Sequence, residues 1–284
     1  MPDIGNYLFG GSSSDQAITL GGVTPSGESG VCDMTYIFLK VTEMLKLRDP
    51  NVNARYSVAK NSDAYLRRLC EVNLVTTATP SLHGDDTVMR AIAHHGYAPE
   101  EVRDWSATGC VEPTISGRHM GHTGALMFNM VAALEMALHD GFHPLMRWKL
   151  GPKTGAPEAG AFATFEAFYA AFAEQLAFLA GEAVSYNNLL GEAHRVLRPT
   201  PFLSAFIVGS RESGRDVTEG GARHNSTGVA CIGLADIVDS LVAVKRLVFD
   251  ERMTSFGELT RALAADFVGQ DKLLARITKR VPKF

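Results

Sequence analysis

Helical and strand-forming segments alternate along the first hundred residues, and this alternation constrains the fold more than any other feature. Apolar residues recur at helical spacing over residues 33–47 and again over 62–74. Short runs of strand-forming residues lie beside them, at 18–20 and 55–59. Chains that alternate in this way form α/β folds. The spacing suits a barrel or a wound sheet, and periodicity does not choose between them.

The rest of the chain is predicted to be mainly helical. Helical patterns cover residues 125–140, 162–195, 234–249, 255–267 and 271–280. A break within the long second segment, near 185–188, is left open. Pro199 and Pro201 end that segment, and a short strand is predicted at 203–208. No repeat or low-complexity linker divides the chain, so residues 1–284 are predicted to form one large domain or part of a bigger one.

Composition excludes several classes of function. The net charge is -4 and the isoelectric point is near 6.1, which argues against a nucleic-acid-binding protein. No apolar run is long enough to span a membrane, and the N-terminal residues lack the pattern of a signal peptide. We therefore expect a soluble protein of the cytoplasm that has neither nucleic acid nor membrane as a partner.

The four cysteines are widely separated and form neither a disulfide framework nor a CxxC metal site. A reducing compartment is the simplest interpretation. Cys70 lies in an apolar helical pattern and Cys231 in an apolar run, so both are predicted to be inert thiols in the core.

The segment Gly109-Cys110-Val111-Glu112-Pro113 places a thiol and a carboxylate two residues apart. Glycine and proline make a helix interior improbable here, and in an extended segment residues i and i+2 point to the same side. A carboxylate disfavours a thiolate, so this pair is a poor ionic nucleophile. A sulfur that reacts as a radical needs no thiolate, and Glu112 beside it can act as a base.

Other constellations are weaker. His119 and His122, like His139 and His143, have spacings that a metal site can use, but glycines interrupt both pairs and no HExxH pattern accompanies them. No metal or other bound cofactor is therefore predicted. The phenylalanines between residues 162 and 172 are spaced as a core stripe.

The order of several segments resembles the glycyl radical enzymes, the superfamily that includes pyruvate formate-lyase. The matching segments lie at residues 18–22, 45–55, 79–85, 96–104, 109–113, 214–225 and 240–248. Their common order over nearly the whole chain is more specific than the Gly-Cys-Val-Glu tetrapeptide alone. The resemblance implies an α/β fold, namely the second half of the family's α/β barrel with many surrounding helices. It also implies that residues 1–284 are part of a pyruvate formate-lyase-like catalytic domain.

In that family a glycyl radical converts the loop cysteine to a thiyl radical, which takes a hydrogen atom from the substrate. The resemblance implies that Cys110 is the thiyl carrier and that Glu112 deprotonates a substrate hydroxyl, as in the dehydratase-type members. Val111 replaces the second cysteine of pyruvate formate-lyase, which disfavours acetyl transfer. The implied function is a lyase that cleaves a C–O, C–N, C–S or C–C bond of a small molecule, as a dehydratase or decarboxylase.

The sequence departs from the best-known members after the loop. Where polyol and choline enzymes carry a second acid, this chain has Gly121-His122-Thr123-Gly124-Ala125. His119, His122 and Thr123 are therefore the candidates for contacts with a different substrate. His224 stands where tyrosine is common in the family.

No Arg-Val-x-Gly-Tyr motif of the radical-bearing domain occurs in the sequence. We therefore expect that the glycyl radical domain is absent, that the chain is an internal part of the enzyme, and that it is inactive alone. Its expected partners are the missing domain, a radical S-adenosylmethionine activating enzyme with an iron–sulfur cluster, a small-molecule substrate and a second copy in a homodimer. A non-catalytic remnant or structural subunit, and an ordinary thiol enzyme, are the alternatives.

Overall fold

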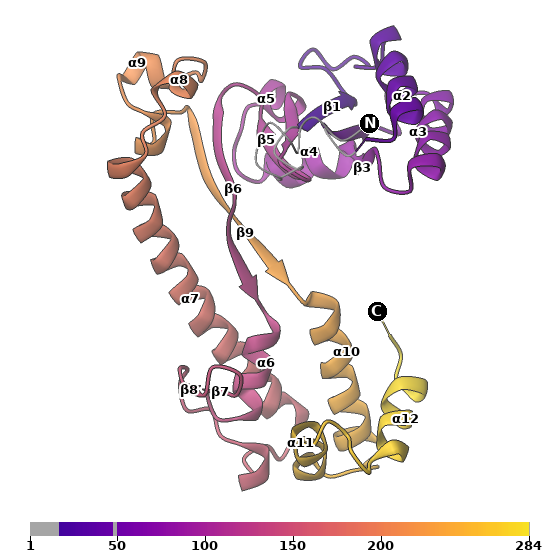
Figure 1. The fold of residues 1–284 in the computed structure, drawn as a ribbon, viewed down its shortest axis with the longest axis vertical. Coiled ribbons are helices and arrows are strands. Elements are labelled where there is room, and N and C mark those ends of the chain that lie inside the picture. The colour runs from indigo at the N-terminus through magenta and orange to yellow at the C-terminus, as the bar shows by residue number, and fades with distance from the viewer. Residues whose placement is uncertain (1–16, 48–49, 284) are drawn as a thin grey trace. The chain divides into compact units, whose positions relative to one another are not determined.

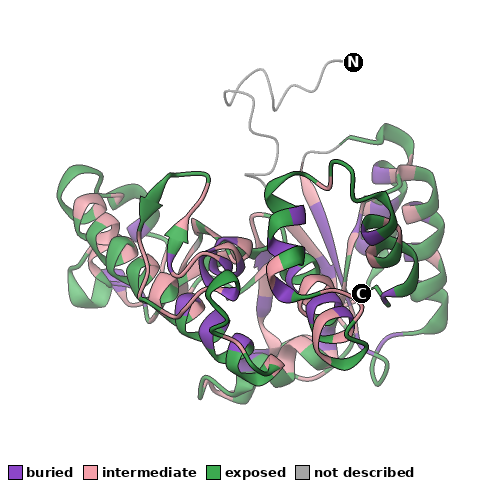
Figure 2. Ribbon diagram, turned by 90° about the horizontal axis from the view of Figure 1, so that it is seen from below, coloured by how far each residue is buried: buried purple, intermediate pink, exposed green. Residues whose placement is uncertain are grey.

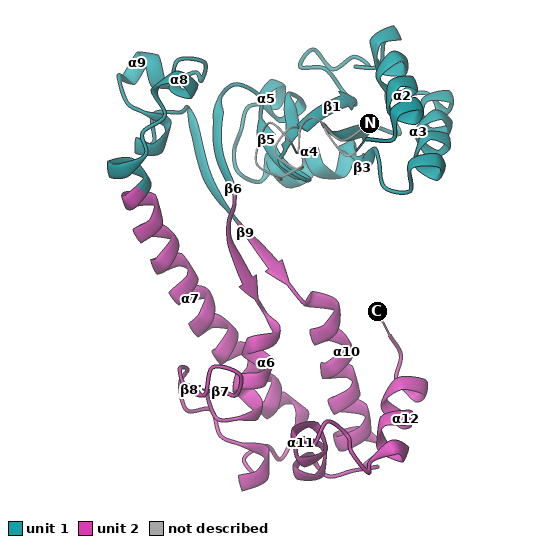
Figure 3. Cartoon of the chain, in the orientation of Figure 1, with its two compact units in different colours: residues 1–123, 194–228 teal, residues 124–193, 229–284 magenta. Residues whose placement is uncertain are grey.

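The computed structural model describes residues 17–47 and 50–283, which form two compact units (Figure 3). Unit 1 comprises residues 1–123 and 194–228, and unit 2 comprises residues 124–193 and 229–284. The chain passes from one unit to the other within three long elements, which are β6 (His119–Asn129), α7 (Phe165–Leu197) and β9 (His224–Ile232). Strands β6 and β9 pair with each other. Each unit has a core of its own.

Unit 1 is built on a three-stranded parallel sheet in the order β1-β2-β3 (Figure 1). The strands are β1 (Ala17–Gly21), β2 (Asn51–Tyr56) and β3 (Ser81–Gly84). Helix α2 (Asp33–Leu45) joins the first two strands, and α3 (Asp63–Thr76) joins the second to the third. Parallel neighbouring strands need such crossover connections, because a tight turn reverses the chain and can join only antiparallel strands. The predicted α/β alternation is confirmed here, although β2 begins four residues earlier than predicted.

The two faces of β2 meet different surroundings. Val52 and Ala54 are buried against α2 and α3, in a cluster that also contains Leu39, Tyr65 and Leu69. Because side chains alternate along a strand, the residues that alternate with Val52 and Ala54 point to the other face. All three are polar, namely Asn51, Asn53 and Arg55. Figure 2 shows buried residues along the strands and exposed residues on the outer sides of the helices.

The polar face of β2 is covered by a second group of short elements. They are α4 (Asp85–Ala93), α5 (Pro99–Arg103) and an antiparallel hairpin of β4 (Trp105–Thr108) and β5 (Glu112–Ile115). Their apolar side chains form a small core around Trp105, which is 1% exposed. This group carries the hairpin loop that contains Cys110.

The remaining part of unit 1 is organised around Asp216. It contains α8 (Pro201–Ser204), α9 (Ser210–Ser213) and the single turn η2 (Val217–Glu219). The Asp216 carboxylate accepts hydrogen bonds from the amides of Thr200 and Thr218 and from the Ser204 hydroxyl. Burial alone would raise the pKa of this carboxyl, but these donors hold it well below its usual range. The strand predicted at 203–208 is wrong, because Pro201 starts a helical turn instead.

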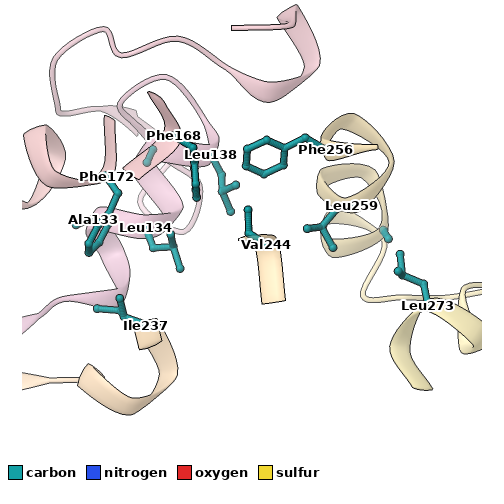
Figure 4. Close-up of a cluster of buried hydrophobic side chains, with 12 residues drawn as sticks. Ala133, Leu134, Leu138, Phe168, Phe172, Ile237, Val244, Phe256, Leu259 and Leu273 are labelled. Atoms are coloured by element: carbon teal, nitrogen blue, oxygen red, sulfur yellow. The ribbon is translucent and has the colours of Figure 1, made fainter. Parts of the chain in front are cut away.

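Unit 2 is mainly helical. It contains residues 165–193 of α7 together with α6 (Val131–Leu138), α10 (Leu234–Val244), the wider turn η3 (Lys245–Asp250), α11 (Phe256–Ala264) and α12 (Asp271–Arg280). The short pieces β7 (Phe142–His143), β8 (Trp148–Lys149) and η1 (Pro157–Ala159) connect α6 to α7. The helices meet in one apolar cluster (Figure 4), where the rings of Phe168 and Phe256 pack edge to face at 4.7 Å.

Most of the predicted helices are confirmed. The pattern at 271–280 matches α12 residue for residue, and the phenylalanines at 168 and 172 are buried as expected. Helix α7 is continuous through 185–188. The helix predicted at 125–140 is wrong in its first part, because residues 125–129 belong to β6 and the helix begins only at Val131. Pairing with β9 overrides the helical propensity of these residues.

The prediction that Cys70 and Cys231 lie in the core is wrong, since both are exposed. The buried face of α3 is formed by Tyr65, Leu69 and Val72. Cys70 follows Leu69 directly and is therefore turned about 100° away from that face. Cys231 lies on β9, most of whose residues are exposed. Within the described residues, no helix is long and apolar enough to cross a membrane.

Candidate active site

Cys110 lies at the tip of the β4–β5 hairpin. Thr108 pairs with Glu112 across the hairpin, so residues 109–111 form its loop. Gly109 has a φ of 62°, a left-handed conformation that glycine adopts without strain and that reverses the chain. The expected extended segment is therefore wrong for Cys110 and Val111. Both of these residues are exposed.

The side chain of Glu112 turns back over this loop. Its Oε2 accepts hydrogen bonds from the backbone N–H of Cys110 at 3.0 Å and from that of Val111 at 2.9 Å. In the part of the chain that the structure describes, Oε1 accepts none, so it is free to take a proton. The carboxylate thus has one oxygen that orders the loop and one that accepts from no donor of the described residues.

Residues of strands β1 and β2 form hydrogen bonds with the hairpin that carries the loop. Asn51, on the polar face of β2, donates from its side-chain amide to the carbonyl oxygens of Gly109 at 3.1 Å and Cys110 at 2.6 Å. Thr19 of β1 accepts a hydrogen bond from the N–H of Ala107 at 3.0 Å. Sequence reasoning missed Asn51, and the signal was the alternation of polar and apolar residues over residues 51–55.

A buried ion pair fixes the base of the hairpin. Arg55 donates to Asp85 from Nε at 2.9 Å, and both side chains are buried. Asp85 also accepts the indole N–H of Trp105 at 2.6 Å, while Arg55 donates to the Trp105 carbonyl at 2.8 Å. The guanidinium lies 4.8 Å from the centre of the indole ring, a cation–π distance. Gly22 leaves the room for this pair, since a Cβ there would lie 2.7 Å from Asp85 Oδ2.

His119 begins β6 and is already engaged within the protein. Its Nδ1 accepts the N–H of Ile115 at 3.3 Å, so in the neutral ring Nε2 carries the proton that it shares with Ser226 Oγ at 2.8 Å. Burial, together with the nearby His224, lowers the pKa of His119 below its ordinary value. His119 is therefore a neutral donor near pH 7.

His119 belongs to a cluster that the sequence did not reveal. The ring of Tyr97 lies 4.6 Å from that of His224, and His224 Nε2 lies 3.2 Å from Oε1 of the buried Glu101. The Glu101 carboxylate also pairs with Arg223 at 3.3 Å. These contacts attach the beginning of β9 to α5.

His122 and Thr123 follow on the same strand. The ring of His122 lies 5.3 Å from that of His194 on α7, in an edge-to-face arrangement. Residues 119 and 122 differ by an odd number of positions, so they point to opposite faces of the strand. The structure therefore does not bring His119 and His122 together.

The parallel sheet with crossover helices, bearing a cysteine hairpin on its polar face, defines a mixed α/β protein. A model of the pyruvate formate lyase-like family matches residues 2–284, and the chain belongs to that family.

The relatives include trans-4-hydroxy-L-proline dehydratase of Clostridioides difficile, which is 29% identical over 94% of this chain and 33% of its own length. They also include (2S)-3-sulfopropanediol dehydratase of Klebsiella oxytoca, 32% identical over 95% of this chain and 32% of its own length. The chain thus spans about a third of the length of the curated relatives that it matches. The glycerol-bound B12-independent glycerol dehydratase from Clostridium butyricum superposes with a TM-score of 0.89, at 29% identity, over 100% of this chain and 35% of that one. The homologues are glycyl radical dehydratases and lyases, and the fold is theirs.

Proposed function

We propose that this chain carries the reacting cysteine of a glycyl radical lyase that acts on a small hydroxyl-bearing molecule. The observation that carries the proposal is the hairpin loop, in which Cys110 is exposed and one oxygen of Glu112 has no donor among residues 17–47 and 50–283. Dehydratases and sulfite-lyases among the relatives support a lyase. The glycyl radical, installed by a radical S-adenosylmethionine enzyme on a domain with the Arg-Val-x-Gly-Tyr motif, would supply the unpaired electron.

The proposed cycle uses two side chains, Cys110 for the hydrogen atom and Glu112 for the proton. The Cys110 thiyl takes a hydrogen atom from a substrate C–H, which forms S–H and leaves a carbon radical. Glu112 takes the proton of the adjacent hydroxyl, the neighbouring leaving group departs with its bonding electron pair, and the proton passes from Glu112 to that leaving group, which restores the carboxylate. The product radical then takes the hydrogen atom back from Cys110, which restores the thiyl. Nothing in this cycle needs a thiolate, so a nearby carboxylate does no harm.

The substrate is proposed by class. The names of the relatives refer to trans-4-hydroxy-L-proline, sulfopropanediol and isethionate, and each of these molecules carries a hydroxyl group. His122 and Thr123 remain the proposed substrate contacts. His119, whose two ring nitrogens already have partners, is better suited to orienting β6. Val111 offers no second sulfur, so formate acetyltransferase activity has no support from this loop.

The first test replaces Cys110. The chain is combined with the glycyl radical domain and the activating enzyme, and turnover is measured on a panel of hydroxyl-bearing substrates. Cys110→Ala should abolish turnover while the glycyl radical stays visible by electron paramagnetic resonance. Cys70→Ala is the matched control, since Cys70 is exposed but lies outside the loop. Full turnover in Cys110→Ala would refute the assignment and favour a role without radical chemistry.

The second test separates the two oxygens of Glu112. In Glu112→Gln, the amide oxygen can still accept the N–H groups of Cys110 and Val111, but the side chain is no longer a base. Turnover should fall by about 10²-fold or more, the size of a lost general base. Glu112→Ala removes both the hydrogen bonds to the loop and the base, so the rate at which Cys110 is alkylated should change as well. Normal turnover in Glu112→Gln would exclude the base role.

A further inference from the structure

A crevice lies beyond the carboxyl ends of the parallel strands of unit 1. Its lining includes a residue within two positions of the end of each strand, namely Val23 after β1, Ser57 after β2 and Asp86 after β3. Ligands of open α/β sheets bind in this position, outside the carboxyl ends of the strands. The volume is about 740 Å³, within the range of small-molecule sites.

The crevice is far from the proposed catalytic loop. Cys110 is held by Asn51, the first residue of β2, whereas Ser57 of the crevice follows the last residue of that strand. Six residues of parallel strand put these two ends about 16 Å apart. The crevice is therefore a second site and not an extension of the Cys110 loop.

The charges of the lining favour an anion. The lining contains three cationic side chains and two carboxylates, which are Lys60, Arg90, Arg103, Glu28 and Asp86. Both oxygens of Asp86 already accept hydrogen bonds, from the Ser57 hydroxyl at 2.7 Å and from the Val58 N–H at 2.9 Å. Its charge is thus directed into the turn after β2, so the three cations outnumber the one remaining carboxylate, Glu28.

Arg103 is set in place for such a ligand. Its Nε donates to the carbonyl oxygen of Pro25 at 2.8 Å, which orients the guanidinium. Among the described residues, neither its Nη groups nor Nζ of Lys60 donates to protein. A planar guanidinium with free N–H groups binds a carboxylate by two parallel hydrogen bonds.

Most of the remaining lining is apolar. Met89 and Ala93 of α4, Tyr97 and Val102 contribute this part. An inorganic anion would leave this surface in water, whereas an organic anion with an aromatic or aliphatic body would cover it. We infer that the crevice is a binding site for a small organic carboxylate, whose charged end lies at Arg103 and Arg90 and whose body lies against α4.

The inference is tested by fluorine NMR of the complete chain with 4-trifluoromethylbenzoate as the probe. The neutral 4-trifluoromethylbenzamide has the same body and is the matched ligand control. The benzoate should bind, and Arg103→Met and Arg90→Met should each weaken binding about fivefold or more, as for a charge-assisted hydrogen bond. Arg67→Met is the protein control, because Arg67 is exposed on α3 and outside the crevice. Ala93→Trp should fill the exposed apolar wall and block binding.

Three results would overturn the inference. These are equal binding of the benzamide, equal affinity in the Arg103 and Arg67 variants, and no benzoate binding at millimolar concentration. Cys110→Ala should leave the affinity for the benzoate unchanged. A lower affinity in this variant would show that the crevice is not separate from the loop. Because binding is measured without turnover, the result does not depend on the proposed lyase activity.

Discussion

The side-chain amide of Asn51 donates a hydrogen bond of 2.6 Å to the carbonyl oxygen of Cys110, 59 residues further along the chain. The same amide reaches the carbonyl of Gly109 at 3.1 Å. Because Asn51 begins a central strand, the position of the reacting loop is set by the sheet as well as by its own hairpin. The polar face of β2 is thus the support of the proposed site.

Asn51→Ala should loosen this loop. Each lost hydrogen bond is worth about 1 kcal/mol, so the rate of Cys110 alkylation by iodoacetamide should rise roughly threefold or more. The rate is followed for the Cys110 peptide by mass spectrometry, because all four cysteines are exposed. Asn73→Ala is the matched control, since Asn73 likewise donates to a carbonyl, that of Pro80, at 2.9 Å. Equal Cys110 rates in the two variants would contradict the supporting role.

Arg55→Met should destabilise unit 1 strongly. The change leaves the fully buried Asp85 carboxylate without its cation, and breaking a buried ion pair in this way costs about 3–5 kcal/mol. Urea unfolding is followed by the fluorescence of Trp105 in a Trp148→Phe background. Arg68→Met, which breaks the more exposed pair with Glu43, should cost about 1 kcal/mol or less. Similar losses in both variants would show that the Arg55–Asp85 pair is not what fixes the hairpin.

The Glu101–His224 pair should make stability depend on acid. Burial alone would raise the pKa of the Glu101 carboxyl, but hydrogen bonds from His224 and the Ala98 N–H, with the charges nearby, hold it below 4.5. A carboxyl whose pKa is lowered on folding stabilises the protein above its unfolded pKa, and this contribution is lost as the pH falls through the folded value.

The difference in urea midpoint between the wild type and Glu101→Gln should therefore be full near pH 6 and shrink below about pH 4.5. Glu100→Gln, at the exposed neighbouring position of α5, should show no comparable difference. A wild-type advantage over Glu101→Gln that stayed constant down to about pH 3 would mean that the carboxylate charge does not stabilise this contact.

Phe168→Ala should destabilise unit 2 by about 3–5 kcal/mol, as expected for a buried phenylalanine that leaves a cavity. Phe168 is 0% exposed and contacts Phe162 and Phe256. The loss is measured by urea unfolding followed by far-ultraviolet circular dichroism, because this unit is mainly helical. Tyr169→Ala, at a 50% exposed position on the same helix, should cost about 1 kcal/mol or less. An equal cost in the two variants would place the core of unit 2 elsewhere.

Local patterns predicted the helices well because their signals are local. The amphipathic spacing at 271–280 lies within α12 itself, and Ser62, whose hydroxyl accepts the N–H of Tyr65, lies directly before the helix α3 that it caps. The strands were predicted less well, since a strand depends on its partners. Residues 125–129 have the composition of a helix, and only pairing with β9 makes them extended.

The sequence by itself determined the α/β alternation, the thiol and carboxylate of the Cys110 loop, and the order of motifs that indicated the family. Tertiary structure decided that one oxygen of Glu112 is bound to the loop backbone and that Asn51 and Arg55 support the hairpin. It also decided that His119 and His122 lie on opposite faces of β6. It also decided that Cys70 is exposed. The physical reason is that residue types and local periods are properties of the chain itself, whereas hydrogen bonds between residues 30 to 123 positions apart exist only after the chain has folded.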